Sequence, residues 1–366
     1  MALQQEGVNV LSFHGGEPFM ETPLSIKEAC VNALMENKTR YAPSSGIPEL
    51  LDLIMEKVRT KNRIPAEPGH AIVVSGGLHG LFGAFLSAVN PGDEVLLLSP
   101  YWTPIRDLIT VAGGQQVLVN TFQARGEALR PILEQHVTER TRVIYFNSPT
   151  NPTGQVYTRA EVETMADFAR THNLAVIADE AYEDILFDGD HISIASLPGM
   201  LERTLTVYTL SKSFAMTGWR IGYVIAMEPW MTGLGKITLN SINGVSTPTQ
   251  WAAVAALQLG PEYFEEIRQG YRQRRDLLID GLQSAGFECE MPAGTFYAFP
   301  QVDKILDGDS WQASNQLLEK ARISSVPGVV FGPDGEGRLR LCFSTSIETI
   351  EAAVEQLKRL RIEDRG

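Results

Sequence analysis

A lysine that directly follows an apolar run is the first candidate for chemistry in this sequence. Lys212 comes after Leu205–Thr209, a run with the composition of a buried strand. In open α/β sheets, binding sites are built where strands end. A lysine amine there can form an imine with an aldehyde once its pKa falls below the free value of roughly 10.4. Taken alone, Lys212 could equally be a surface lysine, so its neighbours decide the interpretation.

The motifs around Lys212 are more specific than the lysine itself, and they follow one another along nearly the whole chain. In chain order they are Gly16-Glu-Pro18, Tyr41-x-Pro-x-x-Gly-Ile-Pro-Glu-Leu50, Ser75-Gly-Gly77, Pro100-Tyr-Trp102, Asn147-Ser-Pro-Thr-Asn-Pro-Thr-Gly154, Asp179-Glu-Ala-Tyr182, Ser211-Lys212-Ser-Phe-Ala-Met-Thr-Gly-Trp-Arg220, Pro327-Gly-x-x-Phe-Gly332 and Arg340-Leu-Cys-Phe-Ser344. Each is a weak match alone, but the collinear set resembles the class I/II aminotransferases, which are fold-type-I enzymes that use pyridoxal 5'-phosphate.

The resemblance implies a role for each polar group around the pyridoxal ring. Lys212 would hold the cofactor as a Schiff base and then act as the base at the substrate α-carbon. Asp179, at the end of the run Leu174–Ala178, would keep a proton on the ring nitrogen through a charge-assisted hydrogen bond. On its own, this aspartate could also cap the next helix. Tyr182 and Asn151 would donate to the 3′-oxygen of the ring and lower the pKa of the imine.

A phosphate site is the second implication of the resemblance. Gly76, Gly77 and Leu78 would open a helix after the run Ala71–Val74, and the N-terminus of a helix attracts an anion. A Gly-Gly pair alone is usually only a loop. Arg220, eight residues after Lys212, would supply a bidentate guanidinium.

Hydroxyl groups and an aromatic ring would complete the cofactor site. Thr209 and Ser211 would supply hydroxyls to the phosphate, although the family usually carries serine where Thr209 stands. Tyr41 would reach the phosphate from a partner subunit, which predicts a homodimer with the site at the subunit interface. Trp102 resembles the aromatic residue that stacks on the ring, with Tyr101 as the adjacent alternative and core packing as the plain interpretation.

The amino acid substrate would be held mainly by an arginine. Arg340 resembles the residue that binds the α-carboxylate, because a planar guanidinium matches a carboxylate bidentately. Asn151 would assist it, and Gly16 would bring backbone close to the substrate. Arg338 would share the same face of the strand, so an exposed salt bridge there is the alternative. No metal site is predicted.

The elements that must position these residues alternate between strands and helices. Near-continuous apolar runs predict strands at Ala71–Val74, Glu94–Leu98, Gln116–Val119, Val143–Phe146, Ala175–Ala178, Leu205–Thr209 and Gly222–Ala226. Between and after them, helices are predicted at Ile47–Thr60, Leu78–Val89, Thr158–Thr171, Tyr263–Ala285 and Ile347–Leu360. This order predicts an α/β fold with a mostly parallel seven-stranded sheet flanked by helices.

A change of pattern near Tyr263 predicts a second, smaller α+β domain. The predicted boundaries are an N-terminal segment 1–36 that joins the small domain, a large cofactor-binding domain 37–262, and the small domain 263–366. This arrangement is that of the aspartate-aminotransferase-like, fold-type-I enzymes.

Composition narrows the setting and the partners. The net charge is −13 without a basic tract, which argues against nucleic acid as a partner. Three scattered cysteines form no C-x-x-C pair, so a disulfide framework and a structural zinc site are not expected. The start of the sequence shows no signal peptide, and no run is long enough to span a membrane. We therefore expect a cytoplasmic enzyme.

The predicted function is amino-group transfer between an amino acid and a 2-oxo acid. A pyridoxal-phosphate lyase or synthase, which eliminates or cyclises, is the enzymatic alternative, because the same residues serve those reactions. A regulator built on this fold would need a DNA-binding domain, for which the sequence has no candidate. A Rossmann dehydrogenase is disfavoured because the Gly76-Gly77 segment lacks the G-x-G-x-x-G pattern.

Overall fold

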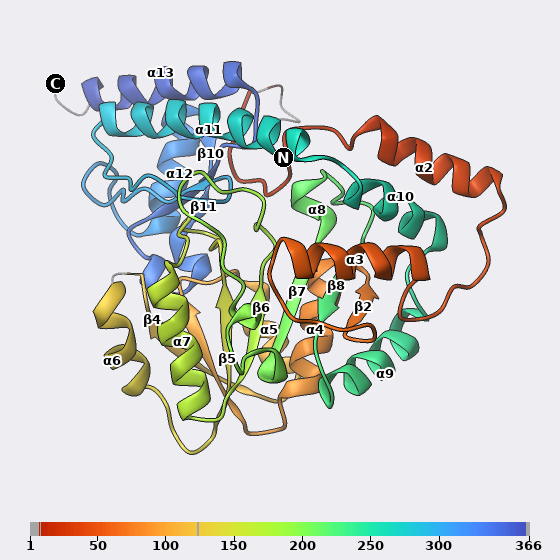
Figure 1. Cartoon of the computed structure of the whole chain (residues 1–366). Coiled ribbons are helices and arrows are strands. Elements are labelled where there is room, and N and C mark those ends of the chain that lie inside the picture. Colours follow the sequence, from red (N-terminus) through yellow and green to blue (C-terminus); the bar gives the residue numbers. More distant parts are fainter. Residues whose placement is uncertain (1–6, 8, 123, 364–366) are drawn as a thin grey trace.

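A seven-stranded sheet organises the larger part of the chain, of which the computed structural model describes residues 7, 9–122 and 124–363 (Figure 1). Its strands are β2 (Ala71–Val74), β3 (Glu94–Ser99), β4 (Gln115–Asn120), β5 (Thr141–Asn147), β6 (Ala175–Asp179), β7 (Thr204–Thr209) and β8 (Gly222–Ile225). They lie in the order β2-β8-β7-β6-β5-β3-β4, and β8 alone runs in the direction opposite to the other six. The predicted fold class and all seven predicted strands are confirmed.

Helices cover both faces of this sheet, because successive residues of a strand point to opposite faces. On β2, Ile72 and Val74 pack with α4 (Gly76–Ala88), α5 (Pro104–Val111) and α9 (Trp230–Ile242). The opposite face of the sheet is covered in two places.

Two helix pairs share that second face. Near β2 and β8 it carries α3 (Pro48–Thr60) and α10 (Thr247–Leu257). Towards β4 and β5 it carries α6 (Leu129–Glu134) and α7 (Arg159–Thr171). Apart from the edge strand β4, the strands are therefore buried on both sides, which explains their continuous apolar sequences.

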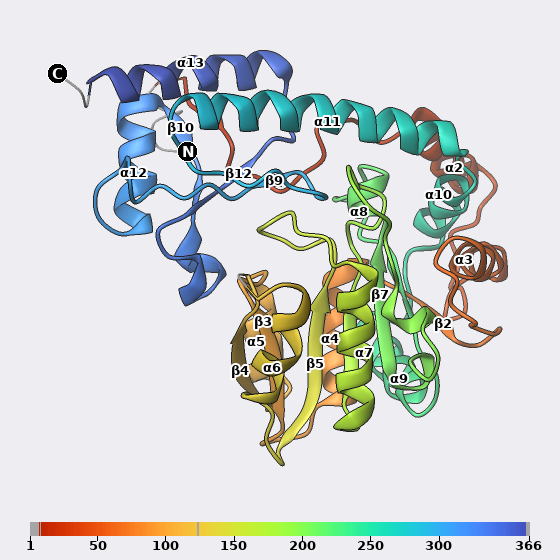
Figure 2. The same ribbon diagram turned by 60° about the vertical axis from the view of Figure 1, so that its left-hand side comes forward.

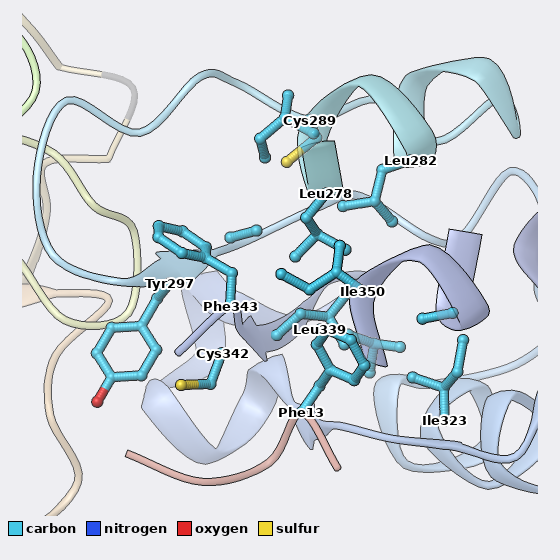
Figure 3. Close-up of a cluster of buried hydrophobic side chains, with 14 of the residues drawn as sticks. Phe13, Leu278, Leu282, Cys289, Tyr297, Ile323, Leu339, Cys342, Phe343 and Ile350 are labelled. Atoms are coloured by element: carbon cyan, nitrogen blue, oxygen red, sulfur yellow. The ribbon is translucent and has the colours of Figure 1, made fainter. Parts of the chain in front are cut away.

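The smaller part of the chain packs three helices on a short antiparallel sheet, above the large sheet in Figure 2. The helices are α11 (Pro261–Ser284), α12 (Ser310–Ala321) and α13 (Ile347–Glu363), and the strands, in spatial order, are β11 (Val326–Pro327), β12 (Leu339–Cys342) and β9 (Tyr297–Ala298). Figure 3 shows the core between them, where Leu278 and Leu282 of α11 lie near Ile350 of α13 and Phe343.

The N-terminal segment contacts both parts of the chain. Strand β1 (Leu11–Ser12) pairs in parallel with β10 (Ile323–Ser324), and Phe13 enters the core of the smaller part. Helix α2 (Leu24–Met35) packs instead on α10 of the larger part. The division into domains at positions 36 and 262 stays a prediction.

Short elements complete the chain. They are α8 (Leu210–Ser213) and the 3-10 helices η1 (Gly126–Ala128), η2 (Ile194–Ser196), η3 (Leu201–Arg203), η4 (Gly328–Phe331) and η5 (Pro333–Gly335). Within the described ranges, every helix is too short or too polar to cross a membrane.

Candidate active site

One cavity of about 470 Å³ lies where β5, β6 and β7 end, and residues of the smaller part close its other side. This is the edge at which open α/β sheets build their sites. The predicted site residues that line it are Gly16, Gly77, Leu78, Trp102, Asn151, Asp179, Tyr182, Thr209, Ser211, Lys212, Arg220 and Arg340. Gly76 and Tyr41 are not among the lining residues.

Lys212 lies on α8, the short helix that begins where β7 ends. Its Nζ donates a 2.6 Å hydrogen bond to the carbonyl oxygen of Gly16. Burial is the main cause that lowers the pKa of this amine, to about 8. Because only the unprotonated amine is a nucleophile or a base, this pKa raises the reactive fraction of Lys212 at neutral pH.

Asp179 is a buried carboxylate at the last position of β6. The hydroxyl of Tyr145 donates to its Oδ2 at 2.7 Å, and the backbone N–H of Ala181 donates to its Oδ1 at 3.2 Å. Burial outweighs both bonds and raises the pKa of Asp179 to about 6. A cationic group beside this carboxylate would therefore be strongly stabilised.

Arg340 carries a buried positive charge on β12. Its Nη1 donates to Oδ1 of Asn151 at 3.2 Å, and its Nη2 donates to the carbonyls of His14 and Gly15 at 3.0 and 3.3 Å. Its Nε is buried with no partner, and among the described residues no carboxylate pairs with this guanidinium. Because a buried charge with only neutral partners is costly, the site is suited to an anionic ligand.

Its neighbour Arg338 lies elsewhere. Nη1 of Arg338 donates to the carbonyl of Phe299 at 3.0 Å, and the guanidinium lies over the ring of Phe122. The cavity therefore contains Arg340 and not the alternative arginine.

A second cationic corner of the cavity lies at the start of α4. A Cβ added to Gly76 would lie 2.6 Å from Nη2 of Arg220, so the glycine lets the guanidinium approach the helix terminus. Arg220 itself has a left-handed backbone, with φ of 54°, and Nη1 donates to the carbonyl of Thr217 at 2.7 Å. Oγ1 of Thr209 donates to Oγ of Ser211 at 2.9 Å. Backbone amides, an arginine and hydroxyls together form a setting for a phosphate group.

The aromatic residues around the cavity differ in position. Trp102 lines it, whereas Tyr101 is buried behind it, with its backbone N–H bonded to the carbonyl of Phe331. Tyr41 is 91% exposed and lies away from the cavity of its own chain. A role for Tyr41 would therefore have to come from contact with another subunit.

Two tyrosines near the site were not predicted from the sequence. Tyr145 holds the carboxylate of Asp179, and Tyr297 lines the cavity with its hydroxyl 3.0 Å from that of Tyr182. Both lie in apolar runs, Val143–Phe146 and Phe296–Phe299, where they look like core residues. The available signal is chemical: a buried tyrosine hydroxyl needs a hydrogen-bond partner, so a tyrosine in such a run often contacts polar groups.

A cluster of ligand-type groups lies outside the cavity. One ligand atom each from Glu180, Glu183 and His191 falls within 4.8 Å of the others. These groups already have partners: Nε2 of His191 lies 2.8 Å from Oε2 of Glu180, and Glu183 is bonded by Lys57 and Asn62. The cluster is best described as a buried ion-pair network.

Comparison with known proteins finds similar sequences and structures along nearly the whole chain. A family model described as aminotransferase class I and II matches residues 7–357. Aspartate/prephenate aminotransferase of Thermus thermophilus is 38% identical, with 98% of this chain and 93% of that protein covered. The structure of Thermus thermophilus aspartate aminotransferase with maleate superposes with a TM-score of 0.92 at 37% identity, covering 98% and 94% of the two chains. The aromatic aminotransferase of Pyrococcus horikoshii gives 0.93 at 36% identity, covering 100% and 99%.

Proposed function

The chain belongs to the class I and II aminotransferases, and from this premise we propose that it binds pyridoxal 5'-phosphate in the cavity around Lys212. The protein is an aminotransferase that moves an amino group between an amino acid and a 2-oxo acid. The alternative of elimination or cyclisation is disfavoured, because the relatives that match this chain over nearly its full length are named aminotransferases. The observation that carries the proposal is the convergence of Lys212, Asp179 and Arg340 on one cavity.

When bound, pyridoxal phosphate supplies an aldehyde that takes up an amino group and a ring that accepts electrons from the substrate α-carbon. We assign Asp179 to the ring nitrogen, because the buried carboxylate favours a proton on a neighbouring base. Tyr182 and Asn151 are assigned to the 3′-oxygen. The phosphate is assigned to the cationic corner at the start of α4, where Gly76 and Arg220 lie near the hydroxyls of Thr209 and Ser211.

Lys212 and Arg340 are assigned to the substrate. Arg340 binds the α-carboxylate through the guanidinium edge that carries its unpartnered Nε, with Asn151 beside it. This fixes the α-carbon near Lys212, whose amine then removes the α-proton as a tethered base. The lowered pKa of Lys212 keeps the free amine available for this step.

For the side chain of the substrate we propose an aromatic or other apolar group, with aspartate as the competing candidate. Among the residues that line the cavity, Leu81 and Ala181 are apolar and are not assigned to the cofactor. The names of the relatives include aspartate, prephenate and aromatic aminotransferases. A panel of amino donors, which includes phenylalanine, aspartate and glutamate, distinguishes these options through the rate at which each changes the visible spectrum of the bound cofactor.

We also propose a homodimer in which Tyr41 completes the partner's site. The apolar side chains of Leu24, Met35 and Leu239 are 67%, 78% and 50% exposed. They belong to α2 and α9, which lie with the α2–α3 connection on the right-hand side of Figure 1. Exposed apolar surface of this kind is typical of an interaction site.

Substitution of Lys212 tests the proposed function. Wild-type protein incubated with pyridoxal phosphate should become yellow, and borohydride should fix the cofactor on the peptide that contains residue 212. Lys212→Ala should lose the label and almost all turnover, whereas the exposed Lys320→Ala serves as a matched control. A colourless wild type, or a label on another lysine, would overturn the assignment. Pyruvate and ammonia released from a single amino acid, without an acceptor, would indicate elimination instead.

A further inference from the structure

Tyr297 lines the cavity without a role in the scheme above, and we propose that it positions Tyr182 and Arg340 for the reaction. The inference rests on the proposed function, since both residues are assigned there to the cofactor and the substrate. It is supported by three contacts of Tyr297, which involve Tyr182, Arg340 and Gly16.

The first contact joins two phenols. The hydroxyl oxygens of Tyr182 and Tyr297 lie 3.0 Å apart, and both side chains are buried. Tyr182 has a single hydroxyl proton. When it donates this proton to the ring oxygen of the cofactor, its own oxygen is left to accept a proton from Tyr297. Each bond of such a chain polarises the next one, so Tyr297 makes Tyr182 a stronger donor.

The second contact involves the face of the Tyr297 ring. The guanidinium carbon of Arg340 lies 4.3 Å from the ring centroid. A cation over an aromatic face is attracted by the ring quadrupole, more strongly where water is excluded. The ring therefore supports the plane of a guanidinium whose Nε has no protein partner.

The third contact brings Lys212 into the same arrangement. A Cβ added to Gly16 would lie 2.9 Å from the hydroxyl oxygen of Tyr297, so a side chain at this position would displace the tyrosine or the Gly16 backbone. The carbonyl of that glycine accepts the hydrogen bond from Lys212. Tyr297 thus lies between the groups that contact the ring oxygen, the carboxylate and the reactive amine.

The rest of the fold holds Tyr297 in place. Its backbone lies in β9, in register with Cys342 of β12, and its ring packs against Phe296. The titratable groups that face it are Tyr182, Arg340 and Cys342. Burial raises the pKa of Tyr297 to about 12, so its hydroxyl keeps its proton at working pH and can donate. Burial likewise raises the pKa of the Cys342 thiol, to about 11, which leaves the thiol neutral.

Two substitutions separate the hydroxyl of Tyr297 from its ring. Tyr297→Phe removes the hydroxyl but keeps the ring under Arg340. Tyr297→Leu removes both. Tyr271→Phe is the matched control, because Tyr271 is a buried tyrosine of the same core whose hydroxyl bonds to Ser344. The readouts are the pH at which the visible spectrum of the bound cofactor changes and the KM of the best amino donor in the panel.

We expect Tyr297→Phe to raise the spectroscopic pKa of the bound cofactor by roughly 0.5–1 unit, the equivalent of one neutral hydrogen bond. Its KM should stay within about twofold of wild type, because the ring remains. Tyr297→Leu should show the same spectroscopic change and a KM raised roughly 5- to 10-fold. Tyr271→Phe should change neither value.

A spectroscopic pKa of Tyr297→Phe that matches wild type and Tyr271→Phe would overturn the positioning role. So would a KM that rises equally in the Phe and Leu variants. The melting temperature of each apoprotein identifies any variant that fails to fold, and Tyr297→Phe then decides the question alone. Failure of the proposed function looks different, because wild-type protein itself would show no cofactor spectrum.

Discussion

Burial destabilises the charge of Asp179 by more than its two hydrogen bonds stabilise it. Its pKa is raised to about 6 by burial, against 3.8 for the free group. The protonated carboxyl therefore favours folding fully below pH 3.8, and this stability is lost as the pH rises through 6. The loss amounts to about 3 kcal/mol at pH 8. A cationic ring nitrogen would remove this cost, so binding of the cofactor and ionisation of Asp179 are linked.

We therefore predict that Asp179→Asn stabilises the apoprotein at pH 8 but weakens the cofactor site. Urea unfolding of both apoproteins should give a difference in unfolding free energy that grows between pH 4 and pH 6 and then stays constant, by about 3 kcal/mol in total. Turnover of the variant with bound cofactor should fall by orders of magnitude, because the neutral amide of asparagine does not stabilise a proton on the ring nitrogen as a carboxylate does. A difference that is independent of pH would contradict the raised pKa.

Gly76 gives a second prediction at the scale of one residue. Its φ of 77° and its closeness to Arg220 both disfavour a Cβ. Gly76→Ala should lower the affinity for pyridoxal phosphate by at least roughly tenfold, because the guanidinium of Arg220 must move away from the start of α4, where the phosphate is proposed to bind. The control is Gly92→Ala, at a φ of 90° with no atom within 4 Å of the added Cβ.

The comparison with pyridoxal, which lacks the phosphate, makes this test specific. Both alanine variants share the backbone strain, so both should lose some stability. Of the two variants, only Gly76→Ala should lose more affinity for pyridoxal phosphate than for pyridoxal. Equal losses of affinity for pyridoxal and for pyridoxal phosphate would show that Arg220 does not bind the phosphate.

At this scale, motifs with fixed chemistry could be predicted from the sequence. Lys212, Asp179, Asn151 and Arg340 converge on one cavity as the resemblance implies, although their roles stay predictions. Tyr297 could not be placed, because it reaches the site through the pairing of β9 with β12. A strand of two residues leaves no periodic pattern from which such a pairing could be predicted.

At the scale of elements, α7 shows how a local pattern determines a helix boundary. Oγ1 of Thr158 accepts from the backbone N–H of Glu161 at 3.3 Å, and Oε2 of Glu161 accepts from that of Thr158 at 2.8 Å. These reciprocal bonds form a capping box. Glu161 also accepts from Arg125 and from the backbone of Gly126, so the box ties α7 to the preceding segment.

Thr158→Ala should therefore lower the free energy of unfolding by about 1 kcal/mol. Thr164→Ala is the control, because Thr164 lies half-buried inside the same helix and its hydroxyl bonds to the carbonyl of Ala160. It should change stability little. Urea titrations followed by circular dichroism measure both, and equal effects at the two positions would contradict the capping role.

The helices and strands differ in how well they can be predicted from the sequence. Most strands of the large sheet were predictable because burial on both faces produces continuous apolar runs, and the edge strand β4 was predictable from its shorter run Val117–Val119. Helix α2 was not predicted, since Leu24, Leu34 and Met35 are exposed and disrupt the single apolar stripe. Helix α10 packs through small residues such as Ala252, Ala253 and Ala256, which give weak periodicity. Strands β1 and β10 are two residues long and depend on pairing across the chain.

At the scale of the whole molecule, Tyr41 is a predicted site residue that does not reach the cavity of its own chain. It is 91% exposed, whereas the phosphate corner is built by α4 and Arg220. The proposed homodimer reconciles the two, and a symmetric dimer then contains two sites that each use residues from both chains. The wild-type protein should sediment as a dimer at micromolar concentration.

Exchange of subunits between two defective variants tests this sharing of residues. Lys212→Ala lacks the reactive amine, and Tyr41→Phe lacks the hydroxyl proposed to bind the partner's phosphate. In a mixed dimer, the site that contains Lys212 receives Tyr41 from the other chain and is therefore intact. After unfolding and refolding of an equimolar mixture, about a quarter of all sites should behave as wild type, since half of the dimers are mixed and each has one intact site. Turnover is measured at a cofactor concentration too low for Tyr41→Phe alone. If Tyr41 acted within its own chain, no combination would restore a site, and the mixture would show only the average of its components.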